Sequence, residues 1–478
     1  MPKALDLPFR IHEITPTTPP SSRGTGTTAA PRVERFGLPM SRQPTLLRSL
    51  TLRDATMLVI GCIVGVGIFR SASSIANHLQ SPGLIVLLWV LGGLLSLCGA
   101  LCYAELAALF PSTGGDYVYI SRIYGRFWGF LFGWTKLFVE RTGTIAILVF
   151  FFAEYLSRVM PYPPGAGRAL AVGATLLLTW VNVAGVRWGA LVQNLFTLVK
   201  MAALAIVVLA GIHLFLGNAS ASPDWSLPPV KFSTVQSMGV ALVFVLFAYG
   251  GWTEAAYIAE EVQDPTRTVP QAMLQGLVLT GFLYVAVSAA YMLAVPIAAL
   301  PSTPLVAARV VEGAIGPWGG LLMAGLIACS AFGAANGYIL TGGRILYALG
   351  QDHALFARLG RLHPKHRTPA LALWVNAAVV IVLVCTKTFD QIATYSTVAI
   401  TVFYVMAVAG VIILRRRQPK LQRPYRAWGY PWTALLFCLT MVGFIANLWI
   451  EAPKDTAFGF GWMALGIPLY WWSQRSVA

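Results

Sequence analysis

Apolar runs of about 20 residues recur from residue 54 to the end of the chain, and each is long enough to cross a hydrocarbon core about 30 Å thick as a helix. Only 11% of the 478 residues are charged, whereas a soluble domain carries about 25%. We count roughly twelve such runs. The pattern predicts an all-α polytopic membrane protein built as one helical bundle.

The predicted spans lie at 54–79, 83–110, 128–156, 168–185, 191–216, 234–259, 272–297, 317–349, 370–386, 392–414, 431–449 and 457–472. Residues 1–50 are rich in Pro, Ser, Thr and Arg and have no apolar period. Such a segment cannot bury enough surface to fold alone. We therefore predict a disordered cytoplasmic tail at 1–50 and a transmembrane domain at 51–478.

The net charge of +16 is concentrated in short loops, most strongly at 344–367 and 415–426. In membrane proteins the cytoplasmic loops carry an excess of Lys and Arg. With these loops inside, both termini are cytoplasmic and the loop at 217–232 is extracellular. The positive charge then needs no nucleic-acid partner.

The six cysteines all fall within the apolar runs, with no paired loop spacing. The six histidines are scattered, and no HExxH pattern occurs. We therefore expect no metal and no cofactor. The runs also lack the paired aspartates or activated nucleophile of a membrane enzyme and the repeated filter of a channel, so neither class is expected.

The first predicted span contains Gly61-Cys62-Ile63-Val64-Gly65-Val66-Gly67-Ile68-Phe69, with three glycines in seven positions. An interior glycine costs a helix roughly 0.5–1 kcal/mol relative to alanine. Irregular backbone at membrane depth survives only where protein or a water-filled cavity satisfies its polar groups. The stretch is either a helix break that holds a ligand or a Gly61-x-x-x-Gly65 packing motif.

A second glycine interruption, Phe247-Ala248-Tyr249-Gly250-Gly251-Trp252, lies in the sixth predicted span. Broken helices at matching positions of two five-helix halves are typical of secondary transporters with inverted repeats. The halves would be 54–216 and 234–414, with peripheral helices at 431–472. Free N–H groups at half-helix amino ends suit a carboxylate, and free carbonyls at carboxyl ends suit an ammonium group. This combination favours the ligand-binding interpretation and predicts a site for an α-amino acid.

Several motifs resemble those of amino acid permeases of the amino acid–polyamine–organocation (APC) superfamily, most closely the L-amino-acid transporter branch. Gly65-Val66-Gly67-Ile68-Phe69 is similar to the family's G-S-G-I-F signature, and the stretch from Phe247 through Pro270 is similar to its sixth span and following loop. Further matches are Val192 to Thr197 with Lys200, Asn336 to Tyr338 with Leu340 to Arg344, and Arg423-Pro424-Tyr425.

The resemblance implies a LeuT-like fold, a 5+5 inverted repeat with twelve transmembrane helices of which 1 and 6 are broken. It implies that the substrate head group is bound by the backbone around the two breaks: Ile63, Gly65, Val66, Gly67, Phe247, Ala248 and Gly250. The Phe247 ring would close over the site. The family often has serine where this chain has Val66, so backbone N–H groups must hold the carboxylate without that hydroxyl.

Ionisable groups at membrane depth are functional candidates. The resemblance implies that Lys200 stands in for the sodium ion of coupled relatives, either as a proton carrier or as a permanently charged tie between spans 5 and 1. Glu140 would face the substrate side chain and select a cation or carry a proton, unless it only forms a local pair with Lys136 or Arg141. Trp252 and Asn336 are further candidates for side-chain selectivity.

Together these features predict a sodium-independent secondary active transporter of amino acids in the cell (inner) membrane. The alternative is a polyamine or cationic amino acid antiporter, or a proton symporter, that uses Glu140 or Lys200. Human-type members of the branch that the chain resembles pair with a glycoprotein through a cysteine between spans 3 and 4. The loop at 157–167 has no cysteine, so we expect a monomer without a disulfide-linked heavy subunit.

Overall fold

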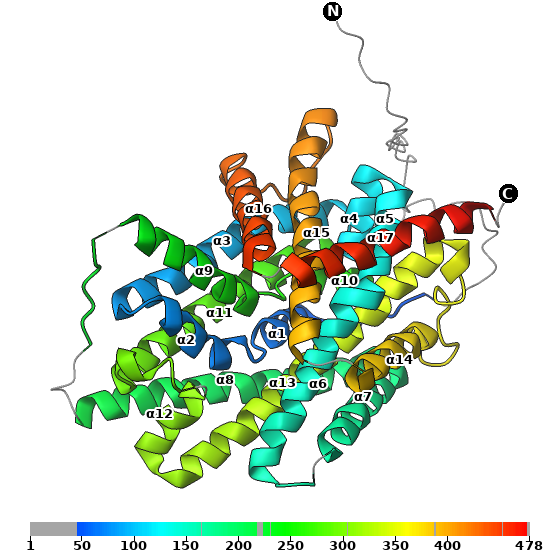
Figure 1. The fold of residues 1–478 in the computed structure, drawn as a ribbon. Coiled ribbons are helices and arrows are strands. Elements are labelled where there is room, and N and C mark those ends of the chain that lie inside the picture. The colour runs from blue at the N-terminus through cyan, green and yellow to red at the C-terminus, as the bar shows by residue number, and fades with distance from the viewer. Residues whose placement is uncertain are drawn as a thin grey trace, which may run out of the picture.

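The computed structural model describes residues 45–163, 165–217, 223–229, 231–303, 305–386, 389–451 and 453–475, and these residues form helices and connecting loops (Figure 1). The α-helices are α1 (Leu52–Ile63), α2 (Gly67–His78), α3 (Pro82–Leu109), α4 (Asp116–Tyr124), α5 (Arg126–Thr135), α6 (Arg141–Val159), α7 (Ala166–Ala184), α8 (Val186–Gly217), α9 (Phe232–Ala248), α10 (Glu254–Tyr257), α11 (Pro265–Ala294), α12 (Val306–Ile315), α13 (Pro317–Asp352), α14 (Ala370–Thr386), α15 (Phe389–Arg417), α16 (Trp432–Glu451) and α17 (Pro453–Arg475). Short 3₁₀ turns lie at η3 (Ala259–Glu261), η4 (Ile297–Ala299) and η5 (Ala354–Phe356), and η1 (Lys136–Glu140) is a π-helical turn.

Each predicted span coincides with one or more helices of the described residues. By length and hydropathy alone, seven helical segments of the described chain could cross a membrane, and α9 and α14 are shorter apolar helices. Two helices were not expected, α4 after the paired glycines Gly114 and Gly115, and α12 in the loop before α13. The protein is a multi-pass helical bundle.

The interrupted segments lie at the centre of the bundle. α1 ends at Ile63 and α2 begins at Gly67, and α9 ends at Ala248 before the short α10 begins at Glu254. In the most apolar window of the α1–α2 segment 78% of the residues are buried, against 17% in α16. The glycine-rich stretches therefore occupy the core, where their backbone must find partners within the protein.

A π-helical turn interrupts the third predicted span. The N–H of Arg141 donates to the carbonyl of Lys136, so η1 joins α5 to α6 with one extra residue in the turn. Such turns change the direction in which the following side chains project and occur often at functional sites. Here the turn carries Lys136 and Glu140.

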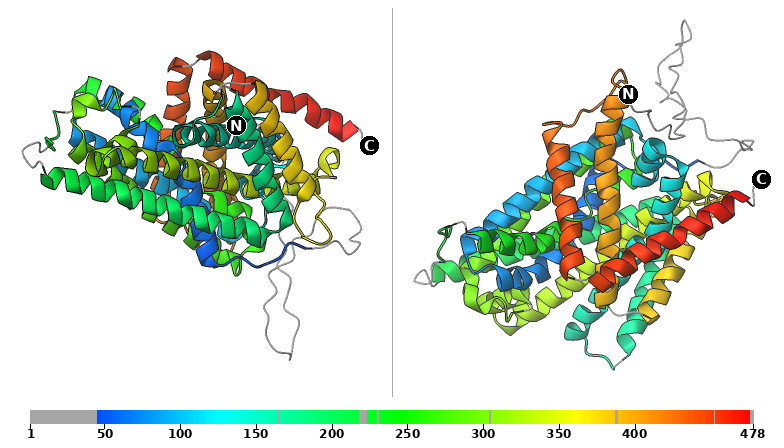
Figure 2. Two further views of the ribbon diagram at one scale, coloured as in Figure 1. Left: turned by 90° about the horizontal axis from the view of Figure 1, so that it is seen from below. Right: turned by 45° about the horizontal axis from the view of Figure 1, so that its top comes forward.

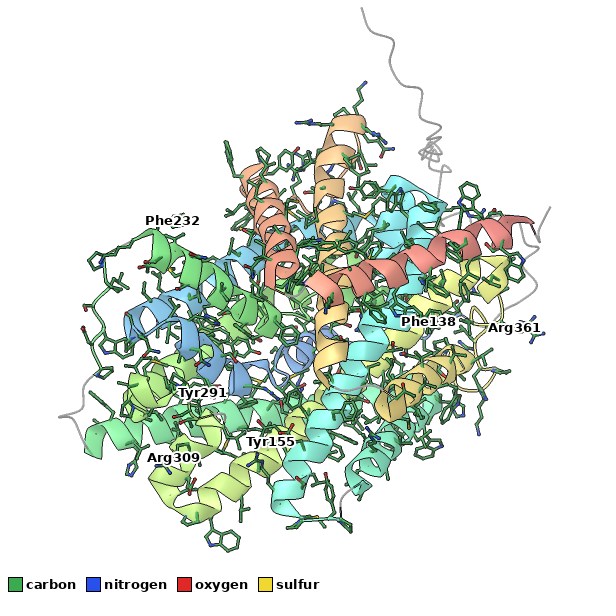
Figure 3. All side chains as sticks on the ribbon, in the orientation of Figure 1. Phe138, Tyr155, Phe232, Tyr291, Arg309 and Arg361 are labelled. Carbon is green, nitrogen blue, oxygen red and sulfur yellow. The ribbon has the colours of Figure 1, made fainter. Side chains whose placement is uncertain are left out.

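The helices α16 and α17 lie at the outside of the bundle and pack against α15 (Figure 2). Phe232, at the start of α9, and Arg361, in the loop before α14, lie at opposite ends of the bundle (Figure 3). The loop predicted to be extracellular and the basic loop predicted to be cytoplasmic are therefore far apart.

Ordered structure begins before the predicted domain boundary at residue 51. Leu46 and Leu50 are buried, and Leu50 forms an isolated parallel bridge with Val262. The part of the predicted tail at 1–44 lies outside the described residues.

Candidate functional site

A cavity of about 140 Å³ lies between the two interrupted helices. An apolar cavity of about 150 Å³ is large enough for a benzene-sized molecule, so this one has room for a single small ligand. Its wall is completed by the described side chains Ser96, Thr144, Ile147, Leu148, Tyr338, Ile400, Thr401, Tyr404, Phe437, Met441 and Phe444. Most of the lining side chains are apolar, and the polar groups come from the backbone of the two interruptions, from the carboxylates Glu140 and Glu254 and from a few hydroxyl groups.

All of the residues predicted to bind the substrate head group line this cavity: Ile63, Gly65, Val66, Gly67, Phe247, Ala248 and Gly250. The two stretches also touch each other. A Cβ atom on Gly67 would come within 2.9 Å of the Cα and Cβ atoms of Ala248. The close approach of the two interruptions thus requires glycine at position 67. The roles of these residues in substrate binding stay predictions.

The first interruption presents amide groups to the cavity. The first N–H groups of α2, which begins at Gly67, have no intrahelical acceptor. They lie at the positive end of the helix dipole, so an anionic ligand is favoured there.

The carbonyls of the first interruption are held by side chains from other helices. The Ser330 hydroxyl of α13 lies 3.3 Å from the carbonyl oxygen of Val64 and 3.1 Å from that of Gly65. The Tyr284 hydroxyl of α11 donates to the carbonyl of Ile63 at 2.9 Å and is 3.2 Å from that of Ala248. Tyr284 therefore bridges the two interruptions.

The second interruption folds mainly on itself. The N–H of Gly250 donates to the Phe247 carbonyl at 3.0 Å, and that of Glu254 donates to the Gly251 carbonyl at 3.2 Å. Gly251 has a φ of +106°, and a Cβ there would lie 2.8 Å from the carbonyl carbon of Cys62. Phe247 lines the cavity and is 49% exposed, so its ring is only partly covered by other groups, and its closing over a ligand stays a prediction.

The two glycines of the Gly61-x-x-x-Gly65 pattern have different roles. A Cβ on Gly61 would overlap the side chains of Gln193 and Thr197 on α8, at 2.1 and 2.4 Å. A Cβ on Gly65 would meet only Leu148, at 3.7 Å. Close helix packing therefore explains Gly61, whereas Gly65 lies in the interruption and faces the cavity.

Trp252 lines the cavity and packs against aromatic neighbours. Its ring stacks on Tyr404 at a centroid distance of 5.6 Å and meets Tyr103 edge-on at 4.9 Å. The Tyr103 hydroxyl donates to Asp116 at 3.2 Å, at the start of α4. Burial raises the pKa of Asp116 to about 6.

Two carboxylates line the cavity and both are paired. The Glu140 carboxylate lies 2.7 Å from the Lys136 ammonium and 3.9 Å from Nε of Arg141. The local pair that the sequence offered as an alternative is therefore present, at a residue that also faces the cavity. Glu254 accepts hydrogen bonds from Arg141 at 2.9 Å and from the Thr341 hydroxyl at 2.6 Å.

Lys200 lies behind the cavity wall rather than in it. Its ammonium is fully buried and donates to the carbonyl of Gly61 at 2.5 Å, the last turn before the first interruption. This contact joins α8 to α1, as the predicted tie requires. Whether the lysine also carries a proton stays a prediction.

Asn336 is not among the residues that line the cavity. Its amide donates to the Gly189 carbonyl and the Gln193 side chain and accepts from Asn182 at 2.9 Å. The side chain therefore joins α13 to α7 and α8, and its predicted part in side-chain selectivity stays a prediction.

Sequence reasoning missed the side chains that support the interruptions. Ser330 and Tyr284 are two of several polar residues in long, mainly apolar helices, so the sequence marks them as candidates without indicating their partners. Arg141 was expected only as a possible partner of Glu140, and Thr341 only as part of a motif, so their hydrogen bonds to Glu254 were not predicted.

Comparison with known proteins places this architecture in a family. The amino acid permease family model matches residues 50–472. The chain is 33% identical to the large neutral amino acids transporter small subunit 2 of Oryctolagus cuniculus, over 89% of this chain and 80% of that protein. It is 30% identical to the human Asc-type amino acid transporter 1, over 95% of this chain and 88% of that protein.

A bacterial protein is similar over nearly its whole length. The chain is 31% identical to the serine/threonine exchanger SteT of Bacillus subtilis (strain 168), over 91% of this chain and 98% of that protein. Matches of this extent agree with the motifs at both interruptions. The chain therefore belongs to the amino acid permeases of the APC superfamily, in the branch of the L-amino-acid transporters.

Proposed function

We propose that this chain is a sodium-independent secondary active transporter that carries one α-amino acid at a time across the cell (inner) membrane by alternating access. Proteins of its family are transporters, not enzymes. The observation that carries the proposal is the meeting of two helix interruptions, far apart in sequence, at one small cavity. In the proposed mode, N–H groups of the first interruption and carbonyls of the second bind the two charged ends of an amino acid head group.

In the proposed binding mode the substrate carboxylate lies at the amino end of α2, against the N–H groups that begin at Gly67. The substrate ammonium donates hydrogen bonds to the carbonyls of Phe247 and Gly250. Val66 offers no hydroxyl, so the peptide groups carry the recognition of the carboxylate. The Phe247 ring would move over the bound substrate, since it is half-exposed beside the open cavity.

The proposed architecture is the LeuT-like arrangement of two inverted five-helix repeats with peripheral helices at the carboxyl end, twelve transmembrane segments in all. The central position of the interrupted segments and the outer position of α16 and α17 support it. We propose that both termini are cytoplasmic, because Arg361, in the basic loop before α14, lies at the end of the bundle opposite Phe232 at the start of α9.

Exchange of one amino acid for another is the transport mode that we propose. A similar bacterial protein is named a serine/threonine exchanger, and this chain matches almost all of it. Lys200 would supply the positive charge beside the first interruption that a sodium ion supplies in coupled transporters, through its contact with the Gly61 carbonyl. A symporter that releases a proton from Lys200 is the alternative.

Substrates with uncharged side chains are favoured over cationic amino acids and polyamines. Two similar proteins are named for large neutral amino acids and for serine and threonine. Glu140, the residue on which a cationic specificity would depend, is paired with Lys136 at 2.7 Å.

We propose that the protein works as a monomer without a disulfide-linked heavy subunit. The rabbit relative is named a small subunit, which implies a larger partner for that protein. In this chain the loop at 157–167, between α6 and α7, has no cysteine. The six cysteines lie within helices, and Cys62 and Cys102 are buried.

Uptake into proteoliposomes tests the function. Labelled leucine, serine, lysine and putrescine are offered to purified protein, with and without unlabelled amino acid inside and with and without a pH gradient. We expect leucine or serine uptake that saturates, needs internal substrate and is independent of sodium. Uptake driven by the pH gradient in vesicles without internal substrate would favour the symporter, and no uptake of any amino acid would refute the proposal.

A further inference from the structure

The carboxylates that line the cavity are each paired with a cation that does not line it. Glu140 is paired with Lys136 at 2.7 Å, and Glu254 with Arg141 at 2.9 Å. All four side chains are buried. The formal charges of these two pairs cancel, so the cavity offers no net charge to the side chain of a ligand.

The two pairs differ in their support. Glu254 also accepts a hydrogen bond from the Thr341 hydroxyl at 2.6 Å. Oε2 of Glu140 lies near Lys136, and the next cation, Nε of Arg141, is 3.9 Å away. Among the described residues no other group donates a hydrogen bond to this oxygen. Neutralisation of Glu140 therefore depends on Lys136.

Lys136 is held in place on the side away from the cavity. Its ammonium lies 5.5 Å from the ring centroids of both Phe132 and Tyr257. Aromatic faces attract a cation but leave its charge in place. The π-helical turn η1 contains both Lys136 and Glu140, so one turn of backbone fixes the pair beside the cavity.

We propose that Lys136 determines the charge specificity of the site: by neutralising Glu140 it restricts the cavity to amino acids with uncharged side chains. The inference rests on the proposed amino acid transport. With the pair intact, a cationic side chain would lose its hydration without gaining a free counter-charge. Without the lysine charge, Glu140 would be an uncompensated carboxylate in a poorly solvated wall, and a cationic side chain would supply its partner.

The test compares lysine and leucine uptake by the full chain in proteoliposomes, for the wild type and Lys136→Met. We expect the wild type to carry leucine in clear preference to lysine. In the variant, the ratio of lysine to leucine uptake rises by about tenfold or more, because an unpaired charge a few ångströms from the ligand is worth over 1.4 kcal/mol in a partly buried site.

The double variant Lys136→Met/Glu140→Gln removes both charges and is the matched control. Its preference for leucine should return, which a merely structural role of Lys136 would not produce. Lys231→Met, at an exposed lysine before α9, should leave the ratio unchanged.

Three results would overturn the inference: equal lysine and leucine uptake by the wild type, an unchanged ratio in Lys136→Met, or a gain of lysine uptake that persists in the double variant. If Lys136→Met does not give folded protein, the uptake ratio of the single variant Glu140→Gln tests the inference instead. It leaves Lys136 uncompensated and should raise glutamate uptake relative to lysine, and an unchanged ratio counts against the inference. A wild type that carries no amino acid refutes the proposed function instead.

Discussion

The two helix interruptions reach the same cavity but are stabilised in different ways. The first is held by side chains of three other helices, since Lys200, Tyr284 and Ser330 donate to its carbonyls or to those just before it. The second is stabilised mainly by hydrogen bonds within its own backbone and by a turn at the positive φ of Gly251, and of the side chains that support the first only Tyr284 reaches it, at the Ala248 carbonyl. The backbone of the first is thus supported mostly by other helices, and that of the second mostly by its own turn.

This difference predicts how each interruption responds to substitution. A change at the first acts through distant partners, and a change at the second acts through glycine geometry. The half-exposed Phe247 belongs to the second, whose carbonyls accept a hydrogen bond from Tyr284 but none from Lys200 or Ser330. We expect the second interruption to move more during transport.

The largest effect is expected at the tie between α8 and the first interruption. Lys200→Met removes a fully buried ammonium and leaves the Gly61 carbonyl without its donor. A hydrogen bond from a charged group contributes about 1.5–3 kcal/mol, so initial uptake in proteoliposomes should fall about 10- to 100-fold. Lys231→Met serves as the control, and wild-type uptake by Lys200→Met would contradict the role of the tie.

A smaller loss is expected at the second interruption. Gly251→Ala places a Cβ at a φ of +106° and 2.8 Å from the carbonyl carbon of Cys62. The left-handed conformation alone costs a non-glycine residue about 1–2 kcal/mol, so uptake should fall roughly 5- to 30-fold, with a lower melting temperature. Gly239→Ala on α9, where a Cβ meets nothing within 4 Å, should behave as the wild type. Equal behaviour of the two variants would mean that the second interruption does not depend on the glycine geometry at Gly251.

Ser330→Ala tests the scaffold with a milder change. It removes the hydroxyl that contacts the Val64 and Gly65 carbonyls. The loss of one neutral hydrogen bond is worth about 1 kcal/mol, so the KM for leucine uptake should rise about fivefold. Ser302→Ala, at an exposed turn far from the cavity, is the control. An unchanged KM would mean that the first interruption keeps its shape without Ser330.

The smallest effect, and the only gain, is expected at Val66. Val66→Ser places a hydroxyl at the start of α2, where it can donate to a bound carboxylate. The KM should fall about two- to fivefold, the size of one modest hydrogen bond. Val66→Ala removes the same methyl groups without adding a hydroxyl, so it separates polarity from size. A lower KM in both variants would assign the gain to space alone.

Much of the fold follows from the sequence because apolar runs of membrane length leave few alternatives. The predicted span at 370–386 coincides with α14. α11 begins at Pro265, seven residues before the predicted start at 272. A proline is favoured at the first position of a helix, but the prediction followed the apolar run, which begins later. α12 is a helix of ten residues in a connecting segment, too short for a membrane-length pattern to indicate.

The candidate site could be predicted from the sequence only where it is formed by backbone groups. Glycine clusters indicated both interruptions, so Gly65, Gly67 and Gly250 could be named from sequence. Side-chain roles were not, because one residue turns a helix by about 100° and a small error in register moves a side chain to another face. Asn336 therefore faces α7 and α8 instead of the cavity, and the partnership of Glu140 with Lys136 became specific only when distances were known.

The bridge between Leu50 and Val262 affects how the protein should be handled. The N–H groups of Ser49 and Leu50 both donate to the Glu261 carbonyl, and the N–H of Gln263 donates back to Leu50. The Glu261 carboxylate is in turn bound by Arg344 at 3.0 Å. The chain entering α1 is thus fastened to the segment that follows the second interruption. We expect an affinity tag or fluorescent protein joined directly before residue 45 to disturb the hydrogen bonds of Ser49 and Leu50. Labels for purification or imaging should therefore be attached elsewhere.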